Sequence, residues 1–542
     1  MSVETSIGED AASVNPLAPP STTHETAQIA RAAGVIALGN VISRVLGLVR
    51  ETIKAHLFGA GGAVDAYTVA TLVPTMMYDL LVGGAVDSSL VPVFSELAEE
   101  QRKEMWALVS ILLSLVVVAL ALFILVVELF APQVAFLLSS GSSDAVLAQT
   151  ARLLRITVPA VLFLNMTGVL SGLLYALKRF VFPAFAAALF NAGIVVMTLL
   201  FHNRIGIAAM ATGLLAGAVL QFTLQLLGLR DARLRFKLAL AHPGLRRIVT
   251  LYTPIVLGLL FEILISRTIS YNLASRTGEG GISWMNYATY VRQLPQGLVA
   301  TAVSFAVLPT LSVHAAKERN GGSSGAFQGT LAKGLRLVAV LIVPATVGLF
   351  ILAQPTIDLV FENGDFLPFD TLMTTQALQF YLLGLPFAAV DLLFIFAFYA
   401  RQDTLTPALI GVGVNILYLA TAILLLPSWG LFSLMIADSF KQLLHALVAG
   451  AILWRRLGGL DGHGLFRTLG VALIAASAMG LAAYGAMIGM QNTFGDDSLI
   501  AELLVVGVPG LFGAGVYIGL LSLMRVEEIG LLTSAVRRRL GW

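Results

Sequence analysis

The sequence predicts an all-α polytopic membrane protein with fourteen transmembrane helices, built as two parallel-repeat six-helix lobes plus two C-terminal helices. Of its 542 residues, 58% are hydrophobic and only 12% are charged, whereas soluble proteins carry about 25% charged residues. Apolar runs of about 20 residues, long enough to cross a bilayer as a helix, recur along the whole chain. Motifs of the first half return in the second half, which indicates two lobes of the same orientation.

The expected parts follow in order. Residues 1–26 are polar and contain no Lys or Arg, which favours a disordered cytoplasmic arm over a signal peptide. The fourteen spans are expected to begin near Ala27, Ala63, Met105, Val146, Val181, Ile205, Ile248, Ile282, Leu331, Thr371, Thr404, Leu431, Leu465 and Leu499. They form an N-lobe (27–230), a cytoplasmic linker (231–247), a C-lobe (248–458), two further spans (459–525) and an amphipathic cytoplasmic tail (526–542).

Two pairs of motifs carry the internal repeat. Val91-Pro-Val-Phe-Ser95 matches Leu308-Pro-Thr-Leu-Ser312 at an offset of 217 residues. Pro183-Ala184 followed by Asn191 matches Pro407-Ala408 followed by Asn415 at an offset of 224 residues. The 217 offset also carries Arg50 onto Arg267. Chance similarity between apolar helices is the alternative explanation.

The basic residues of the loops predict the orientation in the cell (plasma) membrane, because cytoplasmic loops are enriched in Lys and Arg. One set of alternate connections holds twenty basic residues. The other set holds five, which are Lys54, Arg152, Arg155, Arg204 and Arg276. Both termini of this multi-pass protein should therefore be cytoplasmic.

Charged residues inside the apolar segments are the candidate functional residues, because charge at membrane depth is costly and marks substrate or ion paths. Guanidinium groups bind phosphate oxygens in a planar fork and stay charged. We therefore predict that a diphosphate substrate is bound by Asn40, Arg44, Arg50, Arg267 and Arg292. The acids expected to balance these charges, or to bind a coupling cation, are Glu51, Asp65, Asp79 and Glu262.

Simpler explanations exist for some of these residues. Arg44 and Arg50 could extend to lipid headgroups, and Asp65 could stabilise the start of a helix. Asp438 and Lys441 are three residues apart and could form only a local ion pair.

Enzymatic and nucleotide-driven functions are not expected. The chain has no cysteine and a net charge of only +2, so neither thiolate chemistry nor nucleic-acid binding is indicated. We find no catalytic arrangement of Ser, His and Asp and no phosphate-binding loop. We expect no cofactor beyond a coupling ion, Na⁺ or H⁺, or the membrane potential; the sequence does not decide whether a metal binds.

Several motifs together resemble one family. They are Ser43-Arg44-Val-Leu-Gly47-Leu-Val-Arg50-Glu51, Asp65-Ala66-Tyr67, Pro92-Val-Phe-Ser95, Leu153-Leu-Arg-Ile-Thr157-Val-Pro159, Phe398-Tyr-Ala-Arg-Gln-Asp403-Thr-Leu-Thr-Pro407 and Asn415. Over roughly residues 28–525 the chain resembles the MurJ/MviN lipid II flippases of the MOP exporter superfamily. The resemblance implies alternating access, a lipid-tail groove at the last two helices, and export of an undecaprenyl-diphosphate-linked peptidoglycan precursor. It also implies functional roles for Arg44, Arg50 and Asp65.

The chain departs from the family pattern at two places. Tyr78-Asp79 and Gly83 stand where the family has Arg-Arg and Glu, and Tyr287-Ala-Thr-Tyr290 replaces Tyr-Ala-Asp-Arg. Two other functions therefore stay open. One is an ion-coupled exporter of another lipid-linked oligosaccharide or an amphipathic drug, and the other is a non-transporting membrane scaffold of cell-wall synthesis. We expect a monomer whose partners are a polyprenyl-diphosphate lipid and, as candidates, cell-wall synthases.

Overall fold

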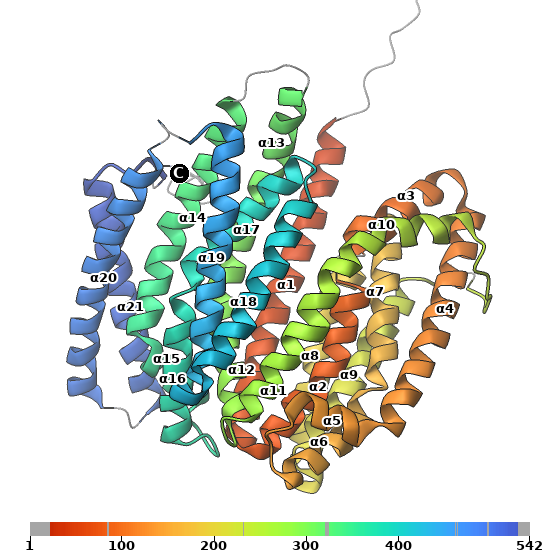
Figure 1. Ribbon diagram of the computed structural model, residues 1–542, viewed down its shortest axis with the longest axis horizontal. Coiled ribbons are helices and arrows are strands. Elements are labelled where there is room, and N and C mark those ends of the chain that lie inside the picture. Colours follow the sequence, from red (N-terminus) through yellow and green to blue (C-terminus); the bar gives the residue numbers. More distant parts are fainter. Residues whose placement is uncertain are drawn as a thin grey trace, which may run out of the picture.

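The computed structural model describes residues 22–83, 86–230, 232, 234–319, 325–460, 462, 464–495, 498–528 and 530, and within them the regular elements are all helices (Figure 1). The N-lobe contains α1 (Thr22–Phe58), α2 (Gly62–Leu81), the π-helix η1 (Val86–Leu90), α3 (Val91–Glu100), α4 (Arg102–Leu129), α5 (Ala131–Ser139), α6 (Asp144–Thr157), α7 (Ala160–Ala176), α8 (Val181–Ile205) and α9 (Ala208–Leu227). The C-lobe contains α10 (Pro243–Leu260), η2 (Phe261–Arg267), α11 (Thr268–Ser275), α12 (Gly281–Pro295), η3 (Gln296–Ala300), α13 (Thr301–Arg319), α14 (Gly325–Ile351), α15 (Ala353–Phe361), α16 (Pro368–Leu382), α17 (Leu385–Ala400), α18 (Leu405–Trp429) and α19 (Phe432–Leu457). The last two helices are α20 (Leu465–Phe494) and α21 (Leu499–Leu523).

The two lobes repeat one another helix by helix, which confirms the predicted parallel repeat. Helices α8 and α18 each have 25 residues, and α5 and α15 each have nine. The α6–α7 pair bends by 42° and the corresponding α16–α17 pair by 44°. A π-helix interrupts the second span of each lobe, as η1 in one and η3 in the other.

The described residues contain nine helices long and apolar enough to span a membrane, or up to eleven if each bent pair counts as one span. The chain is therefore a multi-pass membrane protein. The spans predicted to begin near Ala27, Ala63 and Ile248 are not among these, so the total of fourteen stays a prediction.

Two predicted boundaries were wrong by one helical turn or more. Helix α1 begins at Thr22, inside the predicted arm, and α10 begins at Pro243, inside the predicted linker. For α10 the reason is local, because Pro suits the first helical position and the ring of His242 accepts a hydrogen bond from the Gly244 N–H (3.1 Å). These first turns are polar, so a search for apolar segments misses them. Residues 1–21 and most of the predicted tail lie outside the described residues.

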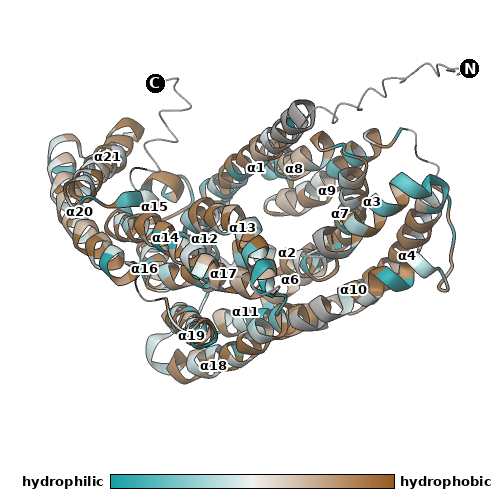
Figure 2. Ribbon diagram, turned by 90° about the horizontal axis from the view of Figure 1, so that it is seen from above, coloured by the Kyte–Doolittle hydropathy of each residue, from teal (hydrophilic) through white to brown (hydrophobic). Residues whose placement is uncertain are grey.

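The lobes meet at the end of the molecule drawn at the bottom of Figure 1, where α1 and α11 end; we call this end the base. There the Gly141 N–H donates to the Ser275 hydroxyl (3.0 Å). The Tyr287 hydroxyl donates to the Gly59 carbonyl (2.9 Å), and the Asp365 N–H to the His56 carbonyl (3.0 Å). Seen from above, α20 and α21 form the outermost pair beside α14 and α15 of the C-lobe (Figure 2).

Candidate functional site

A polar cavity of about 440 Å³ lies between the lobes. Its wall is formed mainly by α1 and α2 of the N-lobe and by η2, α11, α12, α16, α18 and α19 of the C-lobe. Along α2, the lining residues Tyr67 and Thr68 near the base are buried, Thr75 is exposed, and the Asp79 side chain is 42% exposed. The cavity is therefore closed toward the base and open toward the opposite end.

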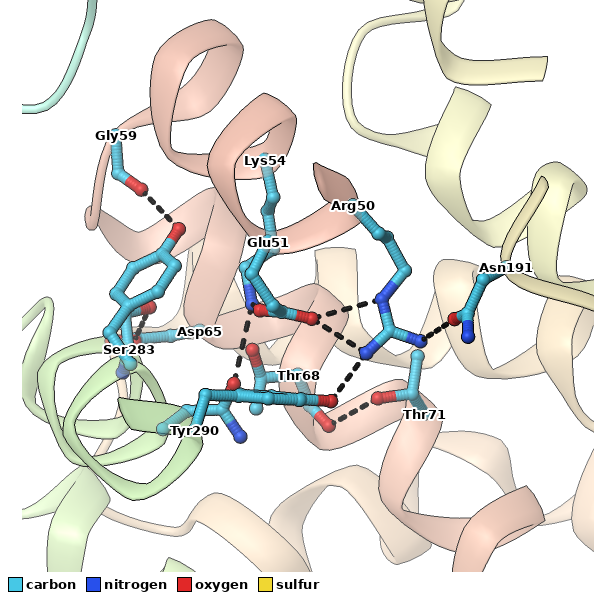
Figure 3. Close-up of polar contacts among 12 residues, drawn as sticks. Arg50, Glu51, Lys54, Gly59, Asp65, Thr68, Thr71, Asn191, Ser283 and Tyr290 are labelled. Atoms are coloured by element: carbon cyan, nitrogen blue, oxygen red, sulfur yellow. Dashed lines mark hydrogen bonds and ion pairs between the residues drawn. The ribbon is translucent and has the colours of Figure 1, made fainter. Parts of the chain in front are cut away.

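Little more than one turn of α1 places a cluster of charges in the wall, which we call the N-lobe triad: Arg50, Glu51 and Lys54 (Figure 3). One carboxylate oxygen of Glu51 accepts from Arg50 Nε (3.0 Å) and Nη2 (2.7 Å), and the other pairs with the Lys54 ammonium. Arg50 also donates to the Asn191 side-chain carbonyl (2.9 Å) and to the Tyr290 hydroxyl. The guanidinium is therefore held in place by both lobes.

A second cluster, the C-lobe triad, consists of Arg292, Asp438 and Lys441. The Asp438 carboxylate pairs with the Lys441 ammonium (3.1 Å) and also with the Arg292 guanidinium. The pairing of Asp438 with Lys441 confirms the local ion pair that the sequence suggested, and Arg292 extends it to α12. Asp438 and Lys441 line the cavity, whereas Arg292 lies behind them over the Tyr381 ring, with 4.5 Å from guanidinium carbon to ring centroid.

A third charged pair connects the lobes across the cavity. Asp79 on α2 accepts from Arg267 on η2 (2.7 Å), and their side chains are 42% and 32% exposed. Glu262 lines the cavity on the same π-helix as Arg267. Within the described part of the chain, Glu262 has no ion pair within 4 Å.

Besides Arg292, three predicted site residues lie outside the cavity wall. Asn40 and Arg44 are exposed on α1, and the Arg44 guanidinium lies against Gly297, where a Cβ atom would be 2.4 Å from Nη1. Asp65 is buried and accepts from the Gly280 N–H (2.7 Å), the Ser283 N–H (2.8 Å) and the Ser283 hydroxyl (2.6 Å). It thereby connects α2 to the first turn of α12, where a carboxylate is favourable for the helix dipole.

Sequence reasoning placed Lys54 wrongly, in an outer loop. The structure places it on α1, with only 2% of its side chain exposed. Burial is possible because Glu51 supplies the opposite charge and the Tyr287 ring lies 4.5 Å from the ammonium. The signal was present in the sequence, since an acid followed by Lys three residues later places both on one helical face. The prediction also missed the tyrosines of the wall, Tyr67, Tyr271, Tyr290, Tyr381 and Tyr418.

The Phe398–Pro407 motif forms the turn between α17 and α18, away from the cavity. Asp403 accepts from the Thr406 N–H (2.9 Å) and hydroxyl (2.6 Å), and from Arg456 of α19 (2.5 Å). Partial burial acts to raise the pKa of Asp403, but these three donors outweigh it and bring the pKa to about 2. This motif fixes a turn rather than forming the cavity.

A separate apolar groove of about 770 Å³ lies between α14, α20 and α21. Its wall includes Pro344, Gly348, Met479, Gly513 and Tyr517. The Tyr517 hydroxyl donates to the Val340 carbonyl (2.8 Å), so the hydroxyl is already satisfied. The groove offers an elongated ligand contact with hydrocarbon almost alone.

Two repeated helical lobes with a polar cavity between them are the architecture of membrane transporters that work by alternating access. Residues 54–505 match the family model described as Lipid II flippase MurJ. The chain is 33% identical over 389 residues to the lipid II flippase MurJ of Burkholderia cenocepacia, covering 69% of this chain and 74% of that protein. It is 29% identical over 467 residues to the probable lipid II flippase MurJ of Haemophilus influenzae, covering 82% and 90%. The chain belongs to the MurJ lipid II flippase family.

Solved structures agree with this fold. A structure described as lipid II flippase MurJ in an inward closed conformation matches with a TM-score of 0.74 and 22% identity, covering 89% of this chain and 98% of that chain. An inward-facing multidrug resistance MATE family transporter of the MOP superfamily matches with a TM-score of 0.63 and 14% identity, covering 77% and 95%. At these identities the likeness concerns the fold alone.

Proposed function

We propose that this protein is a flippase that moves undecaprenyl-diphosphate-linked peptidoglycan precursor, lipid II, from the inner to the outer leaflet by alternating access. The observation that carries the proposal is the combination of a cation-rich cavity between the lobes and a separate apolar groove. A lipid diphosphate has one strongly anionic end and one hydrocarbon end, and each hollow fits one of them.

The cavity favours an anionic headgroup. Five cations lie in its wall or directly behind it, namely Arg50, Lys54, Arg267, Arg292 and Lys441, against four acids, namely Glu51, Asp79, Glu262 and Asp438. The surplus of positive charge argues against a cationic drug as cargo, because cationic cargo requires the opposite balance. Transport breaks no covalent bond, so the proposed activity requires no catalytic residue.

The groove at α14, α20 and α21 is proposed to hold the lipid tail. Lining residues such as Leu341, Leu349 and Ile518 are apolar. The tail therefore exchanges contacts with bilayer hydrocarbon for equally apolar contacts in the groove, and van der Waals packing rather than hydrophobic burial would hold it there. Because α14 belongs to the C-lobe, a tail held there would move with that lobe during the transport cycle.

We propose that the base faces the cell exterior and that both termini are cytoplasmic, so the described state is open to the cytoplasm. The chain has no native cysteine, which permits a direct test. Cysteines introduced singly at Ser142 and Asn492 should react in intact cells with an impermeant thiol reagent, and one at Lys103 should not. Labelling of the cysteine at position 103 alone, in place of Lys103, would show that the protein has the opposite orientation.

The charge balance of the cavity wall bears on how transport is coupled to an energy source. A diphosphate brings at least two negative charges into a wall whose surplus is only one positive charge. We propose that Glu262, which has no ion-pair partner in the described part of the chain, accepts H⁺ or Na⁺, or that the membrane potential supplies the driving force. We further propose that the protein acts as a monomer and that cell-wall synthases use its product.

The central experiment has two parts. Cells depleted of their own lipid II flippase should resume growth when this chain is expressed, and proteoliposomes containing the purified chain should translocate labelled lipid II. Rescue without translocation would favour the scaffold function. Translocation of other lipid-linked oligosaccharides but not of lipid II would change the substrate and keep the mechanism.

A further inference from the structure

The N-lobe and C-lobe triads have the same design, although they come from different helices. In each, two cations share one carboxylate, and the acid and the lysine are three residues apart on one helix, α1 or α19. Each of the four cations also faces a tyrosine ring, at 4.5 to 5.6 Å from the ring centroid. Two clusters of one design lie in the wall of one cavity.

The shared carboxylate leaves each triad with one uncompensated positive charge. The six side chains are 2% to 16% exposed, so water screens these charges poorly and an anion is attracted more strongly than at a surface. The pair of Asp79 and Arg267 differs, since one acid faces one cation and both are about a third exposed or more. The surplus charge of the wall therefore lies in the triads.

In each triad one cation is more accessible from the cavity than the other. In the N-lobe triad this is Arg50, whose side chain is 15% exposed; Lys54 also lines the cavity, but its side chain is only 2% exposed. In the C-lobe triad it is Lys441, which lines the cavity, while Arg292 lies behind the wall. The more accessible cations of the two triads are thus one guanidinium from the N-lobe and one ammonium from the C-lobe.

We propose that Lys441 is a substrate-binding residue that takes the second phosphate of a diphosphate whose first phosphate binds Arg50. The Asp438 carboxylate holds the ammonium toward the cavity, and Arg292 in turn fixes Asp438, so both act as positioning residues. This inference rests on the proposed function, because it concerns how the same cavity recognises its substrate. It predicts that the protein distinguishes a lipid diphosphate from a lipid monophosphate.

The test measures binding of farnesyl diphosphate and farnesyl monophosphate to the full-length protein in nanodiscs, by isothermal titration calorimetry. The unmodified protein should bind the diphosphate at least tenfold more tightly. Lys441→Gln should lower diphosphate affinity to near the monophosphate value and change monophosphate affinity less than twofold. Arg50→Gln should weaken both ligands. The matched control is Lys333→Gln, an exposed α14 lysine outside the cavity wall, which should change neither.

The outcomes separate this proposal from the function on which it rests. If Lys441→Gln keeps the full preference for the diphosphate, the role of Lys441 is overturned and the flippase proposal stands. If the unmodified protein binds neither ligand, both fall. Lys441→Arg should retain the preference because it keeps the charge. Should Lys441→Gln reduce thermal stability, Lys441→Met keeps the chain length over the Tyr418 ring and must show the same loss of preference.

Discussion

The central cavity and the apolar groove are two hollows of opposite chemistry in one molecule. The cavity has about 440 Å³ and a wall of charged residues and tyrosines, whereas the groove has about 770 Å³ and a wall of aliphatic side chains, proline and glycine. The cavity lies where the two lobes meet, and the groove lies between the C-lobe and the additional helix pair. A substrate with one charged end and one apolar end can therefore be held at both ends without its hydrocarbon entering the charged region.

The comparison also indicates which hollow must change during transport. The cavity is shared by the lobes, so any movement of one lobe against the other reshapes it. The groove is formed by α14 with α20 and α21, whose mutual packing does not involve the N-lobe helices. We therefore expect the headgroup site to alternate its access while the tail site stays open to the bilayer.

The largest expected effect comes from Arg50, because it lines the cavity and is held by both lobes, through Asn191 and Tyr290. Arg50→Ala removes the cation that Glu51, Asn191 and Tyr290 orient. It should abolish flipping in proteoliposomes with normal insertion of the protein in the membrane. Arg50→Lys should recover only part of the activity, since an ammonium cannot form the planar fork. Full activity of Arg50→Ala would place the headgroup elsewhere.

Arg44 provides the next test, because the role predicted from the sequence and the position found in the structure do not agree. The sequence predicts that Arg44 binds substrate, yet its side chain is exposed on α1 and lies against Gly297 outside the cavity wall. We expect Arg44→Ala to lose most flipping activity, and Arg44→Lys to restore part of it, if the headgroup passes this position on its way into the cavity. Complementation of flippase-depleted cells measures this. Unchanged growth with Arg44→Ala would return the residue to a packing role.

The sequence was sufficient for the all-α class and the repeat, but only partly for the cavity. Apolar run length and the 217- and 224-residue offsets predicted the helices and the repeat, because span length and repeat symmetry depend on local pattern. The same reasoning placed Arg50, Asp79, Glu262 and Arg267 in the spans, and all four line the cavity. It could not show that Asp79 faces Arg267, because these residues are 188 positions apart.

Two further residues show why some positions and roles could not be predicted from the sequence. Lys54 resembled a loop residue because it lies near the end of an apolar segment, and only the continuation of α1 to Phe58 buries it. Asp65 lies in the first turn of α2, and its role depends on α12, a helix more than 200 residues later. For Lys54 the spacing to Glu51 was a local signal, but the covering Tyr287 ring is a tertiary contact; for Asp65 all the partners are tertiary contacts that no local pattern encodes.

A moderate effect should come from filling the groove. Ala514 lines it and is exposed, so Ala514→Trp adds bulk without displacing buried neighbours. It should reduce flipping of lipids with a long polyprenyl chain about tenfold, and should leave binding of farnesyl diphosphate unchanged, because the short chain needs little of the groove. The matched control is Leu511→Trp, at a side chain 78% exposed outside the groove wall. Equal losses for long and short chains would remove the distinction between the two hollows.

The smallest expected effect concerns Arg267, which the repeat relates to Arg50 and which the sequence predicts to share its diphosphate. The Arg267 guanidinium is already paired with Asp79, and both side chains are partly exposed. We therefore expect Arg267→Ala to cost about 1 kcal/mol of diphosphate affinity. This is below the ~2–3 kcal/mol that a buried charged contact contributes. Asp79→Asn should strengthen binding, because it removes the internal competitor of the phosphate.

If Arg50 and Arg267 hold one ligand, the double variant should lose less than the sum of the single losses by at least ~0.5 kcal/mol. Binding of farnesyl diphosphate to the four members of this cycle measures the difference. Strict additivity would separate Arg267 from the diphosphate and leave it as a contact between the lobes, with the headgroup held by Arg50 and Lys441.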